Sequence, residues 1–122
     1  MNFKTPILMS EIKLKTSEIK FTVKLDENKL PVGIDWNASD AGLTDNKSCK
    51  ALMVSVFDEK EKNTFKIDLW TKDMMVDEMK RFFFETFMSM ADTFERATGE
   101  KELSEEIKKF TEWFGKKTEV IK

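Results

Sequence analysis

The stretch Ser17-Glu-Ile-Lys-Phe-Thr-Val-Lys-Leu25 alternates apolar and polar side chains without interruption. Successive side chains of a β-strand point to opposite faces, so the apolar residues of this stretch share one face and the polar residues share the other. One buried face and one wet face are typical of an antiparallel strand. The stretch therefore predicts the first strand of an antiparallel sheet.

The residues before this strand read as a loosely held extension. Ser10-Glu-Ile-Lys-Leu-Lys-Thr16 nearly repeats the residues that follow it, at a spacing of seven. Because seven is odd, Ile12 and Leu14 fall on the strand face opposite to the apolar residues of the second copy. One continuous strand cannot bury both sets, and we expect residues 1–16 to lie outside the folded domain.

Two further stretches alternate in the same way. Leu30–Trp36 follows a polar turn, and Phe65–Leu69 follows the charged turn at 59–63. Pro31 cannot donate a hydrogen bond to a ladder, so we expect the second strand to be an edge or to begin unpaired there. Residues 37–48 read as a loop or a single helical turn.

Residues 49–57 fit two secondary structures. Apolar residues at 49, 52, 53, 56 and 57 match one face of a helix, while those at 52, 54 and 56 match a strand equally well. The charged turn that follows, and the alternating strand after it, favour a β-hairpin.

Two helices are predicted in the last third of the chain. The first runs from near Met75 to Ala97, with Asp73 as a suitable N-cap and Gly99 as a suitable C-terminal stop. The second runs from about Glu102 to Phe114, and we expect it to end at Gly115.

Four strands followed by two helices indicate an α+β fold, in which an antiparallel four-stranded meander carries two helices packed on one face. The length of 122 residues fits one domain. We place this domain at residues 17–115, between the extension at 1–16 and a flexible tail at 116–122.

The composition excludes several classes of site. The chain has no histidine and one cysteine, Cys49, which removes Ser-His and Cys-His nucleophiles, thiolate zinc sites, iron–sulfur clusters and an intramolecular disulfide framework. A net charge of -2 leaves no basic excess to hold a nucleic-acid backbone. We expect no catalytic residues, no metal and no cofactor.

Two groups of residues could be interpreted as catalytic, although a structural interpretation is favoured for both. Lysines near Cys49 could lower the pKa of its thiol, and Asp35, Asp68 and Asp73 could supply a general acid and base. The chain offers no histidine to act as a base for the thiol, and the spacing of the acids does not show that they face one cleft. We therefore interpret Cys49 as a small, partly buried apolar residue and the acids as surface charge.

The chain carries more apolar side chains than a two-layer fold needs. Met53 and Phe57 fall on the second face of the third predicted strand, and Trp70 falls on the corresponding face of the fourth. Phe84 and Met88 lie outside the main apolar stripe of the long helix. The N-terminal extension and the second helix could cover these groups. The alternative is a partner surface, because exposed apolar patches are seldom unused and tryptophan is enriched at interface hot spots.

No segment of the sequence resembles a membrane span or a signal peptide. No run approaches 18 apolar residues, and the only apolar run near the start is Ile7–Met9. We therefore expect a cytoplasmic protein, in which a single reduced thiol is ordinary.

Several motifs resemble one known family. They are Ser17–Val23, Leu25–Asn28, Ile67–Met74, Val76–Phe83 and Ser89–Gly99. Together they resemble the gliding-motility-associated protein GldC family of Bacteroidota, from about Thr16 to Phe114. Met75 stands where family members often have proline, just inside the start of the helix. The resemblance implies a small cytoplasmic protein without known catalytic activity that supports surface gliding, and it brings no catalytic residues.

Three hypotheses for the function follow. The first is a non-enzymatic accessory protein of gliding motility that contacts other motility proteins or associates with itself as a homo-oligomer. The second is a secretion-chaperone-like module that holds an extended client protein. The third is an enzyme that uses carboxylates and needs a cleft with two buried acids. The sequence leaves the direct partner and the oligomeric state open.

Overall fold

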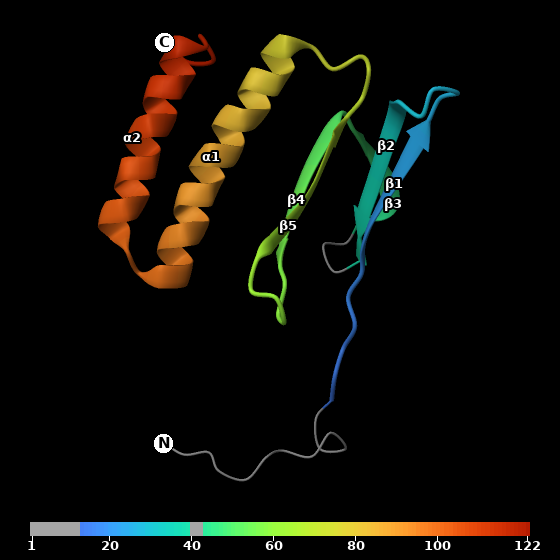
Figure 1. Cartoon of the computed structure of the whole chain (residues 1–122), viewed down its shortest axis with the longest axis horizontal. Helices are drawn as coiled ribbons and strands as arrows, with labels where there is room; N and C mark the ends of the chain where they lie inside the picture. Colours follow the sequence, from blue (N-terminus) through green and yellow to red (C-terminus); the bar gives the residue numbers. More distant parts are fainter. Residues whose placement is uncertain (1–12, 40–42) are drawn as a thin grey trace. The chain divides into compact units, whose positions relative to one another are not determined.

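Strands and helices occupy separate parts of the chain (Figure 1). The computed structural model describes residues 13–39 and 43–122. The chain divides into two units, one of strands up to Lys72 and one of helices from Asp73 onward. Most of the extension predicted at 1–16 lies outside the described residues, and residues 13–16 are exposed and form no strand.

The first sheet has three antiparallel strands: β1 (Ile19–Leu25), β2 (Pro31–Ala38) and β3 (Leu43–Cys49), in the order β1-β2-β3. The alternation at 17–25 correctly predicted a strand there, but the expected burial of its apolar face is wrong, because Ile19, Phe21 and Leu25 are 67%, 44% and 53% exposed. The prediction that the second strand is an edge or begins unpaired at Pro31 is wrong, because β2 is the central strand and Pro31 is the register partner of Leu25. Pro31 is the first residue of β2, next to a register shift between Lys24 and Leu25. At this end of the central strand its missing N–H interrupts no regular ladder.

The strand β3 corrects the prediction of a loop or helical turn at 37–48. Its sequence, Leu-Thr-Asp-Asn-Lys-Ser-Cys, has no apolar alternation that would indicate a strand. Polar side chains pair across the strands instead. Asn37 Nδ2 donates to Asn46 Oδ1 at 2.7 Å, and Ser48 Oγ donates to Asp35 Oδ1 at 3.4 Å. Cross-strand pairs of this kind stabilise a sheet without burial of apolar surface.

The second sheet is a hairpin of β4 (Ala51–Phe57) and β5 (Thr64–Trp70). This confirms the preference for a hairpin over a helix at 49–57. In the turn, one oxygen of Asp58 accepts the backbone N–H groups of Lys60 and Glu61. The predicted single four-stranded meander is wrong, because the described residues form five strands in two antiparallel sheets of three and two.

The helical unit consists of α1 (Val76–Thr98) and α2 (Lys101–Lys117). The N-cap of α1 is Met75 and not Asp73 as predicted; the carboxylate of Glu78 accepts the backbone N–H of Met75 at 2.9 Å. Gly99 ends α1 as predicted, with a left-handed φ of 76° that suits a residue without a Cβ. The predicted end of α2 at Gly115 is wrong, because the helix continues to Lys117.

Small side chains form the contact between α1 and α2. Ala91, Ser104 and Thr111 are each 0% exposed, and Ser104 Oγ donates to the carbonyl oxygen of Ala91 at 2.8 Å. On one side of this seam, the ring of Phe87 lies 5.6 Å from that of Phe110 and 5.3 Å from that of Phe114. In the strand unit, Ile34 and Leu52 are the buried apolar residues among those described. The expected packing of the helices on one face of a sheet stays a prediction.

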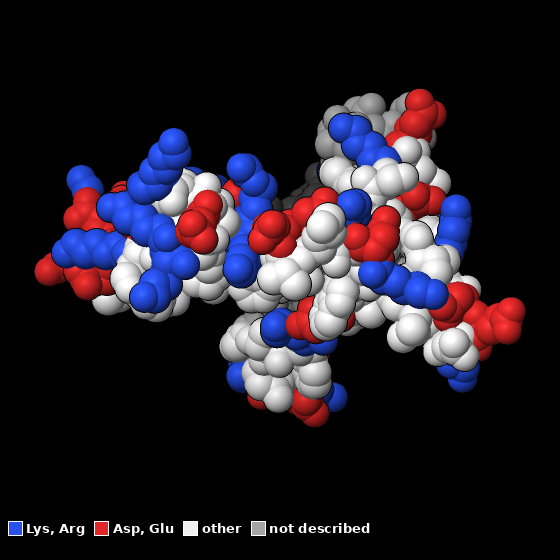
Figure 2. All heavy atoms as spheres, turned by 90° about the horizontal axis from the view of Figure 1, so that it is seen from above, with Lys and Arg blue, Asp and Glu red and all other residues white. Residues whose placement is uncertain are grey.

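Positive and negative side chains alternate over the face that Figure 2 shows. Ion pairs join neighbouring charges, for example Lys108 with Asp92 at 3.0 Å and Arg81 with Glu85 at 3.2 Å. A face of this kind differs from the continuous basic patch of a nucleic-acid-binding surface. Among the helices described, none combines the length and the apolar character needed to cross a bilayer.

Candidate interaction surface around Trp70

The register of the β4–β5 hairpin places three predicted candidates on one face. Ala51 lies opposite Trp70, Met53 opposite Asp68, and Phe57 opposite Thr64. Directly opposed residues of an antiparallel pair point to the same face, and every second residue along a strand shares it. Met53, Phe57 and Trp70 therefore project from the same side of the hairpin.

These three side chains do not form one cluster. Met53 is two residues from the position opposite Trp70, which makes the two side chains diagonal neighbours. Phe57 is at the other end of the hairpin, about 20 Å from Trp70 at roughly 3.3 Å per residue. Trp70 is 55% exposed and Phe57 is 67% exposed, whereas Met53 is half-buried. The hairpin therefore carries a Met53–Trp70 pair and a separate Phe57.

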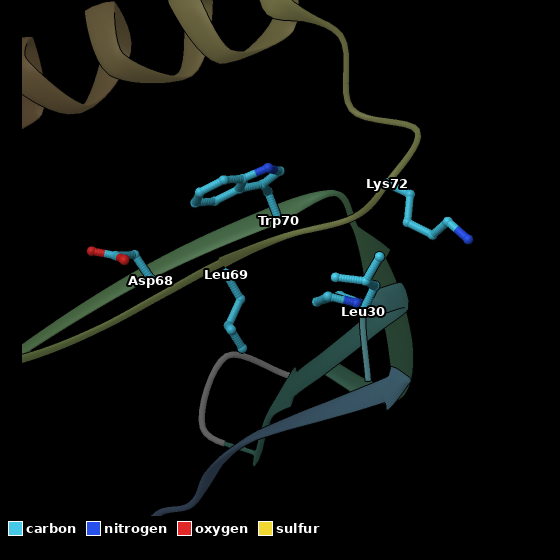
Figure 3. Close-up of a pocket in the computed structure, with 6 residues that line it drawn as sticks. Leu30, Asp68, Leu69, Trp70 and Lys72 are labelled. Atoms are coloured by element: carbon cyan, nitrogen blue, oxygen red, sulfur yellow. The ribbon is translucent and has the colours of Figure 1, made fainter. Parts of the chain in front are cut away.

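Trp70 borders an open, mainly apolar pocket of about 400 Å³ (Figure 3). In the close-up, the side chains of Trp70 and Leu69 point to opposite sides of β5. The lining comes from the start of β2 and from the end of β5 with the residues that follow: Leu30, Pro31, Asp68, Leu69, Trp70 and Lys72.

Lys72 connects the two sides of this pocket. Its backbone N–H donates to the carbonyl oxygen of Pro31 at 3.0 Å, and its Nζ lies 2.8 Å from Oδ2 of Asp26 in the turn between β1 and β2. The other oxygen of Asp26 accepts the backbone N–H groups of Asn28 and Leu30. The hydrogen bond from Lys72, followed by that from Leu30, lowers the pKa of Asp26 to about 2.

The charged groups around the pocket are already paired. Asp68 lies 2.9 Å from Lys66, and Lys72 is held by Asp26. The pocket therefore presents apolar side chains inside a fixed polar rim, and among the described residues that line it Asp68 is the one carboxylate. An apolar side chain of a protein partner suits such a site, with the exposed indole as the contact of largest area.

A comparison with protein families gives a match over residues 31–120, to the family described as "Gliding motility-associated protein GldC-like". The chain belongs to this GldC-like family. Neither the search of curated proteins nor that of solved structures found a match. The matched region contains Trp70, its neighbour Met53 and all of the pocket lining except Leu30, which directly precedes it.

The two candidates on α1 of this GldC-like chain differ in their surroundings. The ring of Phe84 packs over Gly115: a Cβ placed there would lie 2.5 Å from Phe84 Cε1. Phe84 is therefore used in the contact between the helices. Met88 is half-buried and lines a shallow depression of about 680 Å³ that also contains Trp113 and the charged residues Glu105, Lys108, Lys109, Glu112 and Lys116.

Cys49 and Asp35 lie on neighbouring strands of the first sheet, and the structure does not bring Asp35 and Asp68 together on one sheet. Burial raises the pKa of the Cys49 thiol, and the thiol is half-buried in β3. Asp35 lies 3.6 Å from Lys24 on the first sheet, whereas Asp68 belongs to the second. The described residues contain no group of three acids or thiols able to hold a metal ion.

The sequence did not associate Leu30, Pro31 and Lys72 with Trp70. Pro31 pairs with Leu25 at the start of β2, and its carbonyl oxygen accepts a hydrogen bond from a segment that is distant in the sequence. The carbonyl's donor, the backbone N–H of Lys72, cannot be identified from a local pattern, since every residue except proline carries one.

Proposed function

We propose that this chain is a non-enzymatic, cytoplasmic accessory protein of gliding motility, and that it acts by binding another motility protein through the Trp70 pocket. The membership of the GldC-like family supports the motility role. The observation that carries the binding role is Trp70 itself, a large aromatic side chain that is 55% exposed beside an apolar pocket. Central aromatic anchors of this kind dominate the energy of many protein interfaces.

The chemistry of the pocket favours binding over catalysis. Its two charged side chains are both in ion pairs, at 2.9 Å for Asp68 and 2.8 Å for Lys72. A general acid or base would need a pKa shifted toward neutrality, whereas the Asp26 carboxyl beside Lys72 has its pKa lowered to about 2. The partner we expect presents an apolar side chain to the pocket and hydrogen-bonding groups to its rim.

The test is complementation in a gliding bacterium that lacks its own copy of the gene. A Trp70→Ala variant should fail to restore colony spreading, because it removes the anchor, yet it should accumulate and melt like the parent protein. The matched control is Trp113→Ala on α2, since Trp113 is 57% exposed and therefore comparable in size and exposure. This control should restore spreading.

Three outcomes would contradict the proposal. Full spreading with Trp70→Ala would show that the pocket is not the contact. Equal loss with both tryptophan variants at normal abundance would show that the defect is not specific to the pocket. Co-purification of an unfolded exported protein that depends on Trp70 would replace the motility partner with a secretion client.

A further inference from the structure

The strand β4 is paired along one edge. Among the described residues it forms a ladder with β5 and with no other strand. The backbone N–H of Thr71 donates to the carbonyl oxygen of Lys50 at 2.8 Å. This hydrogen bond shows which residues of β4 exchange backbone hydrogen bonds with β5. Backbone groups of the even-numbered residues of β4 point to β5, and those of residues 51, 53, 55 and 57 point away from it.

This outer edge lacks the features that keep strand edges apart. The sequence of β4, Ala-Leu-Met-Val-Ser-Val-Phe, contains no charge, no proline and no glycine. By contrast, β5 contains Lys66 and Asp68. Natural proteins protect open edges with charges, prolines or bulges, so the edge of β4 is well suited to accept another strand.

The charges that flank β4 identify the strand it would accept. Lys50 precedes the strand and Asp58 follows it. When two copies of this segment pair antiparallel about Val54, Lys50 of each copy lies opposite Asp58 of the other. Opposite charges directly across an antiparallel pair stabilise it, whereas parallel pairing would bring like charges together. Both residues also make contacts within their own chain, so the new ion pairs would add to existing ones.

We propose that two copies of this chain associate through β4, giving a continuous four-stranded sheet in the order β5-β4-β4-β5 with Val54 on the two-fold axis. The association does not depend on the proposed motility role. Ala51 would form hydrogen-bonded pairs with Phe57 of the second copy, and Met53 with Ser55, through the backbone groups that point outward in each chain. This contact is isologous, as in most symmetric dimers.

In this sheet, apolar side chains of the two copies become neighbours on both faces of the hairpin. On one face, each strand carries three apolar residues, namely Leu52, Val54 and Val56 on β4 and Phe65, Ile67 and Leu69 on β5. Val56 and Ile67 are 54% and 60% exposed. On the other face, the small Ala51 separates Trp70 of its own chain from Phe57 of the second copy, which leaves room for both aromatic rings. A two-stranded hairpin is marginally stable alone, and four strands with an apolar face are more stable.

The first experiment measures the mass of the full chain by sedimentation equilibrium, where we expect twice 14.3 kDa. Ser55→Pro removes an outward N–H next to the axis and leaves the hydrogen bonds to β5 intact. It should weaken the dimer by about tenfold or more, because the two symmetric hydrogen bonds from Ser55 N–H to the Met53 carbonyl of the second copy are both lost. Lys66→Pro, which removes an outward N–H from β5, is the matched control and should leave the dimer unchanged.

Charge reversal provides a second variant that preserves the backbone. Lys50→Glu would place two glutamates opposite two aspartates and should weaken the dimer by about 3- to 10-fold, in line with the modest value of exposed ion pairs. Lys117→Glu on α2 makes the same change in charge at a residue outside the proposed β4 pairing and should have no effect. A monomeric parent chain, or a dimer that neither Ser55→Pro nor Lys50→Glu weakens, would overturn the proposal.

Cross-linking tests the register directly. In a Cys49→Ser background, Val54→Cys places two thiols on the axis at a non-hydrogen-bonded pair, where the Cα atoms are about 4.5 Å apart and a disulfide can form. Ile67→Cys, on the neighbouring strand of the same face, is the control, because its two copies would lie about three strand spacings apart. Oxidation should link the first variant and not the second. Equal linking of both, or none at position 54, would contradict this register.

Discussion

The contact between α1 and α2 and the β4–β5 hairpin differ in how completely the residues at their centres are buried. Ala91, Ser104 and Thr111 fill the helix contact and are completely buried, with a hydrogen bond from Ser104 to Ala91 across it. The hairpin has six apolar side chains on one face, and among the described residues only Leu52 of that ladder is buried. The helix contact is closed within one chain, whereas the hairpin leaves large side chains exposed.

This difference indicates where each region is sensitive to substitution. Close-packed contacts between small residues have no room for added atoms, so additions should be destabilising there. A half-exposed apolar face tolerates changes in volume, because solvent fills the space that a truncated side chain leaves. Its exposed side chains therefore contribute less to the stability of the unit than buried side chains of the same size.

The largest expected effect is Leu52→Ala in the hairpin. Leu52 is 7% exposed, and removal of a buried leucine side chain should lower the free energy of unfolding by about 2–4 kcal/mol, from lost burial and the cavity it leaves. Ile67 lies on the same face but is 60% exposed, so Ile67→Ala should lower it by less than about 1 kcal/mol. Urea denaturation of both variants at equal protein concentration measures the difference. Equal losses would show that the face is more completely covered than its exposure indicates.

A smaller loss is expected from Gly115→Ala in the helix contact. Alanine favours a helix over glycine by about 1 kcal/mol, but its Cβ would lie 2.5 Å from Phe84 Cε1 and 2.9 Å from Ile121 Cγ1. The overlap should prevail and lower the free energy of unfolding by about 1–2 kcal/mol. The same substitution in a Phe84→Leu background should cost less. Thermal melting of the parent, the two single variants and the double variant completes a double-mutant cycle. A stabilised Gly115→Ala variant would show that the contact is loosely packed.

The sequence predicted most strands because their apolar and polar residues alternate with a period of two, although β1 and β5 bury little of their apolar face in this chain. The alternation at 17–25 and 65–69 predicted β1 and β5, and the stripe of apolar residues predicted α1. The strand β3 could not be found in this way, because its pairing with β2 depends on polar contacts such as Asn37 with Asn46. Gly115 also misled the prediction: a glycine that ends a helix and one that permits close packing look identical in a sequence.

The candidate surface was predictable in part for the same reason. The period of two places Met53, Phe57 and Trp70 on one face, and the register agrees. The pocket beside Trp70 depends on the approach of Lys72 to Pro31 and Asp26, which are distant in the sequence. Tertiary contacts of this kind decide which exposed side chain borders a pocket, and local periodicity contains no information about them.

The smallest expected effect concerns the ion pair between Asp26 and Lys72. The folded pKa of Asp26 is about 2, below the ordinary value of 3.8, so the folded state binds this proton less readily than the unfolded state. The pair therefore contributes stability above about pH 4, and the contribution is lost as the pH falls toward about 2. Asp26→Asn keeps an acceptor for the backbone N–H groups of the turn but removes the charge, so its stability should depend less on pH across this window. Titration of the Asp26 carboxyl by NMR checks the cause: Lys72→Gln should move its pKa back toward 3.8, whereas a pKa that does not respond would show that the backbone hydrogen bonds of the turn, rather than the lysine, dominate.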